Sequence, residues 1–182
     1  MSEPAVPERR RAVFWLNIAV KLLFVALLAF GAFSGLEQFE GKAFGWRLVF
    51  YPLAALLVPL GWWLAGRPKP YPYAVDILFV SPFLVDVLGN VFDLYDSIEW
   101  WDDLNHFVNW FLLSLAVGQL LLRFALPRIE AFVIVVGAGA FAAIVWELGE
   151  YVAFIRNSDE LDTAYTDTLG DMLLGLTGSI AA

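Results

Sequence analysis

The side chains most able to do chemistry lie in three short motifs of the second half of the chain, where acids and one histidine interrupt apolar sequence. The motifs are WWDDLNHFVNW at residues 100–110, WELGEY at residues 146–151 and YTDTLGD at residues 165–171. Carboxylates and an imidazole can hold a divalent metal ion or move protons. The candidate residues are Asp102, Asp103, His106, Glu147, Glu150, Asp167 and Asp171.

The spacing within each motif places its polar residues on one face of a helix. Asp102 precedes His106 by four residues and Glu147 precedes Glu150 by three, and residues at these separations are neighbours on a helix surface. Asp86, in the preceding apolar segment, is expected at the same membrane depth as these residues. An ionisable side chain inside a membrane is costly unless it is paired, hydrated or coordinated. We therefore predict that these polar faces meet in one pocket that opens toward the outer side of the membrane.

The first interpretation of this pocket is a metal site. In it His106, Glu147 and Asp171 are the ligands, and Glu150 acts as a base on a bound water. Carboxylate oxygens with one imidazole suit Zn²⁺, Mn²⁺, Fe²⁺ or Mg²⁺. The arrangement resembles the carboxylate sites of helical bundles, but a single histidine cannot supply the two Glu-x-x-His pairs of a di-iron bundle.

The second interpretation is acid–base chemistry without a metal. Crowded carboxylates cannot all ionise in a low dielectric, so one of the glutamates or Asp171 should keep its proton near neutral pH. The catalytic candidates are then Glu150, Asp103 and Asp167, with His106 as a partner. A third interpretation is purely structural, because polar side chains also hydrogen-bond helices together within membranes.

The elements that must position these residues are membrane helices. The 182-residue chain is 60% hydrophobic and 16% aromatic, with a mean hydropathy of +0.71, which predicts an all-α integral membrane protein forming one domain over residues 1–182. The absence of cysteine excludes disulfides, iron–sulfur clusters and thiolate zinc sites. A net charge of −8 argues against a nucleic-acid partner.

Apolar segments separated by proline, glycine and charge predict a bundle of six transmembrane helices. The last segment is short for a crossing, since about 20 residues are needed to span the hydrocarbon. Basic residues concentrate in alternate connections, which predicts that both termini lie in the cytoplasm and that the outer face is acidic. The predicted spans cover residues 12–33, 45–65, 74–92, 104–124, 131–155 and 166–182.

Three blocks of the sequence resemble an uncharacterised family of small bacterial membrane proteins typified by the inner-membrane protein YjdF. The resemblance covers residues 75–180 and rests on D-x-x-x-H-F, W-E-x-x-E and D-T-x-x-D, carried by Asp102 to Phe107, Trp146 to Glu150 and Asp167 to Asp171. The chain is also loosely similar to VanZ-like proteins, which carry asparagine where this chain has Asp171. The resemblance implies a six-helix protein of the bacterial inner membrane and supplies no reaction.

The leading hypothesis is an enzyme-like pocket that performs metal-assisted or acid–base chemistry on a lipid or lipid-linked substrate. Membrane lipids are the expected partners, and protein partners are not identified by the sequence. The alternatives are a proton- or cation-coupled transporter, which needs a polar path to the cytoplasmic side, and a non-catalytic subunit of a membrane complex. Asp76, near Arg67 and Lys69, is expected to form a cytoplasmic salt bridge.

Overall fold

The computed structural model describes residues 6–153 and 155–182, and within them the chain forms only helices, short helical turns and connections. The predicted all-α fold is therefore confirmed. The long helices are α1 Val6–Phe33, α2 Phe44–Leu64, α3 Tyr73–Val91, α5 Trp101–Leu121, α6 Arg128–Ala153 and α7 Ala164–Ala181. The short elements are η1 Glu37–Phe39, α4 Leu94–Ser97, η2 Ile155–Asn157 and η3 Asp159–Asp162.

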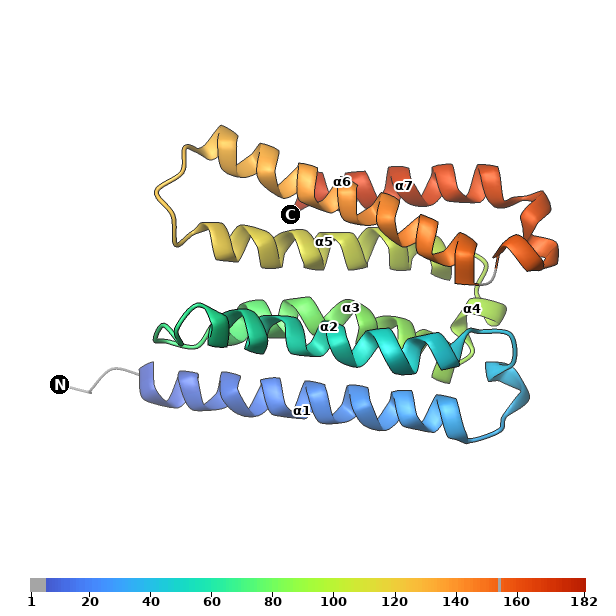
Figure 1. The fold of residues 1–182 in the computed structure, drawn as a ribbon, viewed down its shortest axis with the longest axis horizontal. Helices are drawn as coiled ribbons and strands as arrows, with labels where there is room; N and C mark the ends of the chain where they lie inside the picture. Colours follow the sequence, from blue (N-terminus) through green and yellow to red (C-terminus); the bar gives the residue numbers. More distant parts are fainter. Residues whose placement is uncertain (1–5, 154) are drawn as a thin grey trace.

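Five helical segments of the described chain are long and apolar enough to cross a membrane. They are Glu8–Phe33, Phe44–Leu64, Tyr73–Val91, Trp101–Leu121 and Arg128–Asn157. The predicted sixth span exists as α7, but its 18 residues cover only about 27 Å, less than the roughly 30 Å of a hydrocarbon core. Figure 1 shows that α7 stops short of the end reached by α5 and α6. A sixth crossing remains a prediction.

The helices run roughly along one axis and form two groups, α1 to α3 and α5 to α7 (Figure 1). Contacts between α3 and α5 join the groups. In the first group the side chains of Phe24 and Leu28 from α1 pack with Val80 and Val87 from α3, and all four are buried. The connections that precede α2, α5 and α7 lie at one end of the bundle (Figure 1), so the polar starts of α5 and α7 meet there.

The start of α5 differs from the prediction in a way that matters for the site. The sequence predicted a helix from residue 104, whereas α5 begins at Trp101. Asp102 occupies the first turn of α5, so its side chain lies one helical turn from that of His106, as the four-residue spacing predicts.

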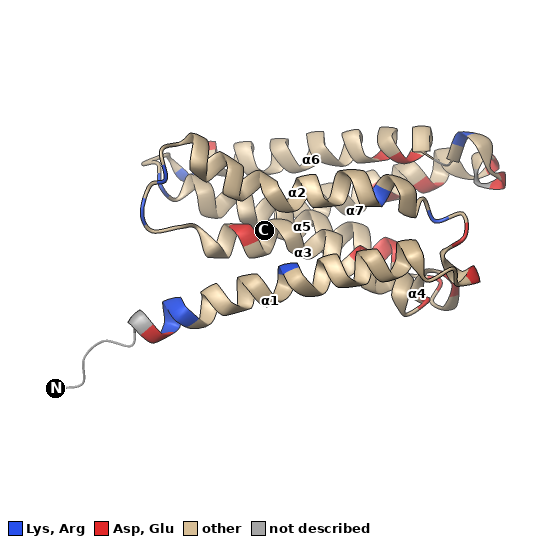
Figure 2. Ribbon diagram, turned by 60° about the horizontal axis from the view of Figure 1, so that its bottom comes forward, with Lys and Arg blue, Asp and Glu red and all other residues tan. Residues whose placement is uncertain are grey.

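Charge is distributed unevenly along the bundle. Figure 2 shows most aspartates and glutamates gathered toward the end that holds α4, whereas basic residues mark the start of α1 and the connections at the opposite end. This asymmetry agrees with the pattern used to predict the orientation. The side of the membrane on which each end lies remains a prediction.

Close contact between α5 and α7 depends on glycine at position 178. A Cβ atom at this position would collide with the backbone oxygen of Phe107 and lie 3.1 Å from the backbone nitrogen of Phe111. Because both neighbours are backbone atoms of α5, neither can rotate away. Gly178 therefore lets α7 approach α5 closely enough for Asp171 to reach the histidine of α5.

We expect Gly178→Ala to lower the free energy of unfolding by about 1–3 kcal/mol, because overpacking against backbone forces the helices apart. The measurement is thermal unfolding of the purified protein in detergent. Gly170→Ala is the matched control, since a Cβ at that position of α7 meets nothing within 4 Å. Equal unfolding temperatures for the two variants would contradict the close approach.

Candidate functional site

A cavity of about 420 Å³ lies at the acidic end of the bundle. Its wall combines polar side chains from the starts of α5 and α7 and the end of α6 with apolar side chains from α3, α5 and α6. The polar lining includes most of the predicted site, and the apolar lining makes the cavity amphipathic. The site residues in its wall are Asp102, His106, Glu150, Asp167 and Asp171, and the apolar ones include Phe83, Trp110, Leu113 and Trp146.

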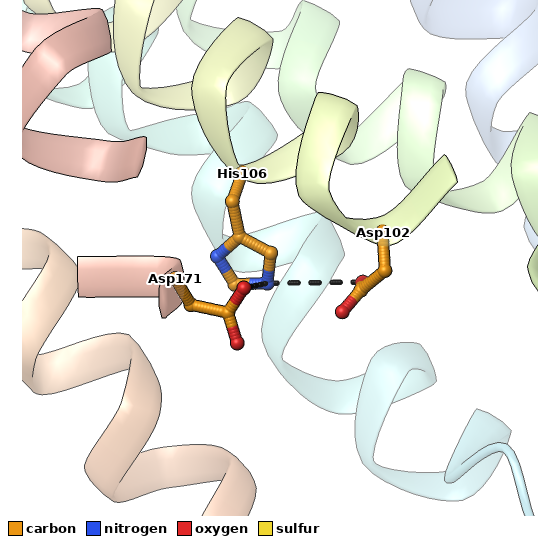
Figure 3. A group of neighbouring side chains, drawn as sticks. All are labelled: Asp102, His106 and Asp171. Carbon is orange, nitrogen blue, oxygen red and sulfur yellow. Dashed lines mark ion pairs between the residues drawn. The ribbon is translucent and has the colours of Figure 1, made fainter. Parts of the chain in front are cut away.

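The imidazole of His106 lies between carboxylates on both of its nitrogens. Its Nε2 is 3.7 Å from Asp102 Oδ1 and 3.7 Å from Asp171 Oδ1, as drawn in Figure 3. Its Nδ1 is 3.6 Å from Glu147 Oε1. These separations exceed normal hydrogen-bond lengths, so the carboxylates surround the ring without closing onto it.

The site draws its members from three helices. Asp102 and His106 are four residues apart on α5, so their side chains share one face. Asp171 comes from α7, at a buried position. Glu147, whose side chain is 5% exposed, comes from α6. The three motifs therefore meet at one pocket, as the sequence predicts.

The ligand atoms form two groups, each compact enough to surround one metal ion. Asp102, His106 and Asp171 make one group, and His106, Glu147 and Glu150 make the other, with the atoms of each group within 4.8 Å of one another. The predicted ligand set of His106, Glu147 and Asp171 is thus divided between the two ring nitrogens. Sequence spacing could not predict this division, because it depends on the orientation of the ring.

Two atoms of the site lack a hydrogen-bond partner within the described parts of the chain. They are His106 Nδ1 and Glu147 Oε1, and both are buried. A buried polar atom without a partner normally costs about 1–3 kcal/mol, so such atoms call for an explanation. The two atoms face each other, which places an unused donor–acceptor pair directly behind the cavity wall.

The remaining predicted catalytic residues differ in their placement. Glu150 is half-buried and lines the cavity, and Asp167 lines it from an exposed position at the start of α7. Asp103 is exposed and is not part of the cavity wall. The sequence indicates Asp103 as a catalytic candidate, whereas the aspartate in the cavity wall is Asp102.

Asp86 lines the same cavity, and both of its carboxylate oxygens already accept hydrogen bonds from neighbouring side chains. Arg47 donates from Nε at 2.9 Å to its Oδ2 and from Nη2 at 3.1 Å to its Oδ1, and the Tyr51 hydroxyl donates at 2.7 Å. The Tyr95 hydroxyl donates at 2.9 Å and itself accepts from Asn105. Asp86 is therefore a structural centre that ties α2 and α3 to α5, and sequence analysis missed Arg47 as its partner.

Tyr95 keeps its proton in this network. Burial raises the pKa of the Tyr95 hydroxyl, and the neighbouring Asp86 carboxylate raises it further. The hydroxyl therefore remains a donor to Asp86 at all physiological pH values.

We expect Arg47→Met to destabilise the protein by about 3–5 kcal/mol, because it leaves the buried Asp86 carboxylate without its cation. The measurement is thermal unfolding in detergent. Lys42→Met is the matched control: its partner Asp96 is 58% exposed, and exposed pairs contribute about 0–1 kcal/mol. If both variants unfold alike, Asp86 does not depend on Arg47.

Comparison with known proteins identifies the family of the chain. The family model described as "Predicted membrane protein (DUF2238)" matches residues 19–182. The chain belongs to this family. It is therefore a multi-pass integral membrane protein, and every candidate site residue lies within the matched region. No curated protein and no solved structure matches it. The resemblance to YjdF and to VanZ-like proteins remains a prediction.

Proposed function

We propose that Asp102, His106 and Asp171 bind one divalent metal ion, which serves acid–base chemistry on a lipid or lipid-linked substrate. The observation that carries the proposal is the convergence of these three ligand atoms, from α5 and α7, on one part of the cavity wall. Two carboxylates and an imidazole form a ligand set for Zn²⁺, Mn²⁺, Fe²⁺ or Mg²⁺.

The charge balance of the site also favours a bound cation. Asp86 has Arg47 at 2.9 Å, and this pair needs no further charge. Glu147 and Asp171, by contrast, face only the imidazole of His106 among the basic side chains that the structure describes. Because one imidazole carries at most a single positive charge, it cannot offset two buried carboxylates, and a divalent ion would supply the missing charge.

Glu147 takes a different role from the one the sequence indicated. In this proposal its Oε1 would accept a hydrogen bond from His106 Nδ1 when His106 Nε2 holds the metal. Metal-bound histidines commonly donate their second nitrogen to a carboxylate, which fixes the tautomer and orientation of the ring. This role also gives a partner to both of the unsatisfied atoms.

Glu150 is the proposed general base. It lines the cavity, and its carboxylate lies in the same group of neighbouring ligand atoms as His106 and Glu147. A metal with three protein ligands keeps open positions at which it can polarise a water or a substrate oxygen. Glu150 is placed to accept the proton from a water in the cavity.

The cavity wall suits an amphiphilic substrate. Its polar side holds the acids and the histidine, and its apolar side holds Phe83, Trp110 and Trp146. A lipid or lipid-linked molecule presents the same two chemistries. We place the pocket at the outer leaflet of a bacterial inner membrane, with six crossings and both termini in the cytoplasm, on the charge asymmetry and the YjdF-like motifs.

The alternative of a transporter requires a polar path along the bundle. Two acids of α3 mark the ends of such a path: Asp76, near the start of the helix, and Asp86, toward its end. They are ten positions apart, which is about 15 Å along the helix. Between them lie the buried apolar side chains of Val80 and Leu84. The described residues therefore favour an enclosed site over a continuous path along α3.

We expect the EDTA-stripped protein to bind one Mn²⁺ or Zn²⁺ per chain, measured by calorimetric titration in detergent. Asp171→Asn removes a proposed ligand and should weaken binding by more than about 100-fold, whereas Glu147→Gln should weaken it by about 10- to 100-fold, as is typical of residues that orient a ligand. Asp103→Asn is the control and should leave binding unchanged, because Asp103 lies outside the cavity wall.

Thermal unfolding of each variant separates lost affinity from lost folding. Absence of metal binding in the wild type would overturn the metal proposal. Stronger loss with Glu147→Gln than with Asp171→Asn would move the metal to the Nδ1 side of the ring, against the assignment given above.

A further inference from the structure

A second cavity, of about 830 Å³, lies at the opposite end of the bundle, where α1 and α3 begin and α2 ends. It is lined by basic and aromatic side chains around a single acid, Asp76. None of its lining residues belongs to the site described above. It therefore needs an explanation of its own.

Asp76 organises the floor of this cavity. Its Oδ2 accepts hydrogen bonds from Lys21 Nζ at 2.7 Å, Asn17 Nδ2 at 3.0 Å and the Tyr71 hydroxyl at 2.6 Å. The sequence predicts a salt bridge of Asp76 at the end that carries Arg67 and Lys69. Asp76 does form a salt bridge, and its partner is Lys21 of α1. Burial raises the pKa of Tyr71, and its hydrogen bond to Asp76 raises it further, so this hydroxyl stays a donor.

The hydrogen bonds of Asp76 fix the position of Lys21, and the cavity lining still carries more positive than negative charge. The Lys21 ammonium has three N–H donors, of which Asp76 is the recorded acceptor for one. Arg10 and Lys69 also line the cavity, and neither forms an ion pair within the described part of the chain. Three cations against the one carboxylate of Asp76 give the lining a net charge of +2.

Aromatic rings form a rigid frame around these charges. The ring centroids of Trp62 and Tyr71 are 5.0 Å apart, those of Tyr71 and Tyr73 are 4.7 Å apart, and those of Phe14 and Tyr73 are 5.8 Å apart. Tryptophan and tyrosine favour the headgroup level of a membrane, where an apolar body and a polar tip are both satisfied. These aromatic side chains suit a cavity at the depth of lipid headgroups.

We propose that this cavity binds the phosphate group of an anionic membrane lipid. Lys21, held by Asp76, and the cavity-lining Arg10 and Lys69 supply charge-assisted hydrogen bonds to phosphate oxygens. Basic pockets between transmembrane helices bind anionic headgroups in this way. A free phosphate offers the same oxygens, but the adjoining α1 and α2 present exposed apolar side chains such as Trp15, Leu22 and Leu60, which suit acyl chains.

The test is native mass spectrometry of the detergent-purified full chain with phosphatidylglycerol, phosphatidylcholine or inorganic phosphate as the probe. We expect one retained phosphatidylglycerol per chain. The double variant Arg10→Gln/Lys69→Gln should weaken its binding by about 10-fold or more, since each basic residue contributes to the attraction. Both side chains are exposed, so the fold should be unaffected, and thermal unfolding checks this.

The matched control is Arg123→Gln/Arg128→Gln. It removes two charges from the same end of the bundle but outside the cavity, and it should leave binding within about 2-fold of wild type. Displacement of the lipid by inorganic phosphate, with the same dependence on Arg10 and Lys69, would assign the phosphate site to a soluble ligand. Equal losses in the two double variants, or equal binding of phosphatidylcholine, would overturn the proposal.

Discussion

Buried carboxylates in a membrane bundle are the constraint on which this structure depends. Burying a charge costs several kcal/mol unless an opposite charge or a metal ion compensates it. The bundle compensates Asp86 with Arg47 and Asp76 with Lys21. In the remaining cluster Glu147 and Asp171 have the His106 imidazole as their only basic neighbour among the residues that the structure describes. The proposed metal ion would meet at the third place the electrostatic requirement that Arg47 and Lys21 meet at the other two.

The two ends of the bundle present opposite chemistry in comparable settings. At one end Asp171 and its neighbours surround a small cavity with excess negative charge, and at the other Arg10 and Lys69 leave excess positive charge around Asp76. Both cavities combine these charges with aromatic walls. The two proposals together assign a cation-assisted reaction to the acidic cavity and the binding of an anionic headgroup to the basic cavity.

Much of the fold and of the candidate site could be predicted because both follow from local periodicity. Apolar runs predicted the long helices to within a few residues, and spacing of three or four residues predicted which acids share a face. The partners of these acids could not be predicted. Arg47 is 39 residues from Asp86 and Lys21 is 55 from Asp76, and only the packing of α1, α2 and α3 brings them together. The choice of Asp102 over Asp103 could not be predicted either, because both lie about one helical turn before His106 in the first turn of α5.

X-ray absorption at the zinc edge of the Zn²⁺-loaded wild-type protein tests the central claim most directly, because it reports the ligands themselves. The account predicts one imidazole nitrogen and carboxylate oxygens at about 2.0–2.2 Å, with the imidazole signal absent from His106→Ala. Since His106 is the only histidine of the chain, the assignment is unambiguous. A spectrum with oxygen ligands alone, or one that is unchanged in His106→Ala, would contradict it.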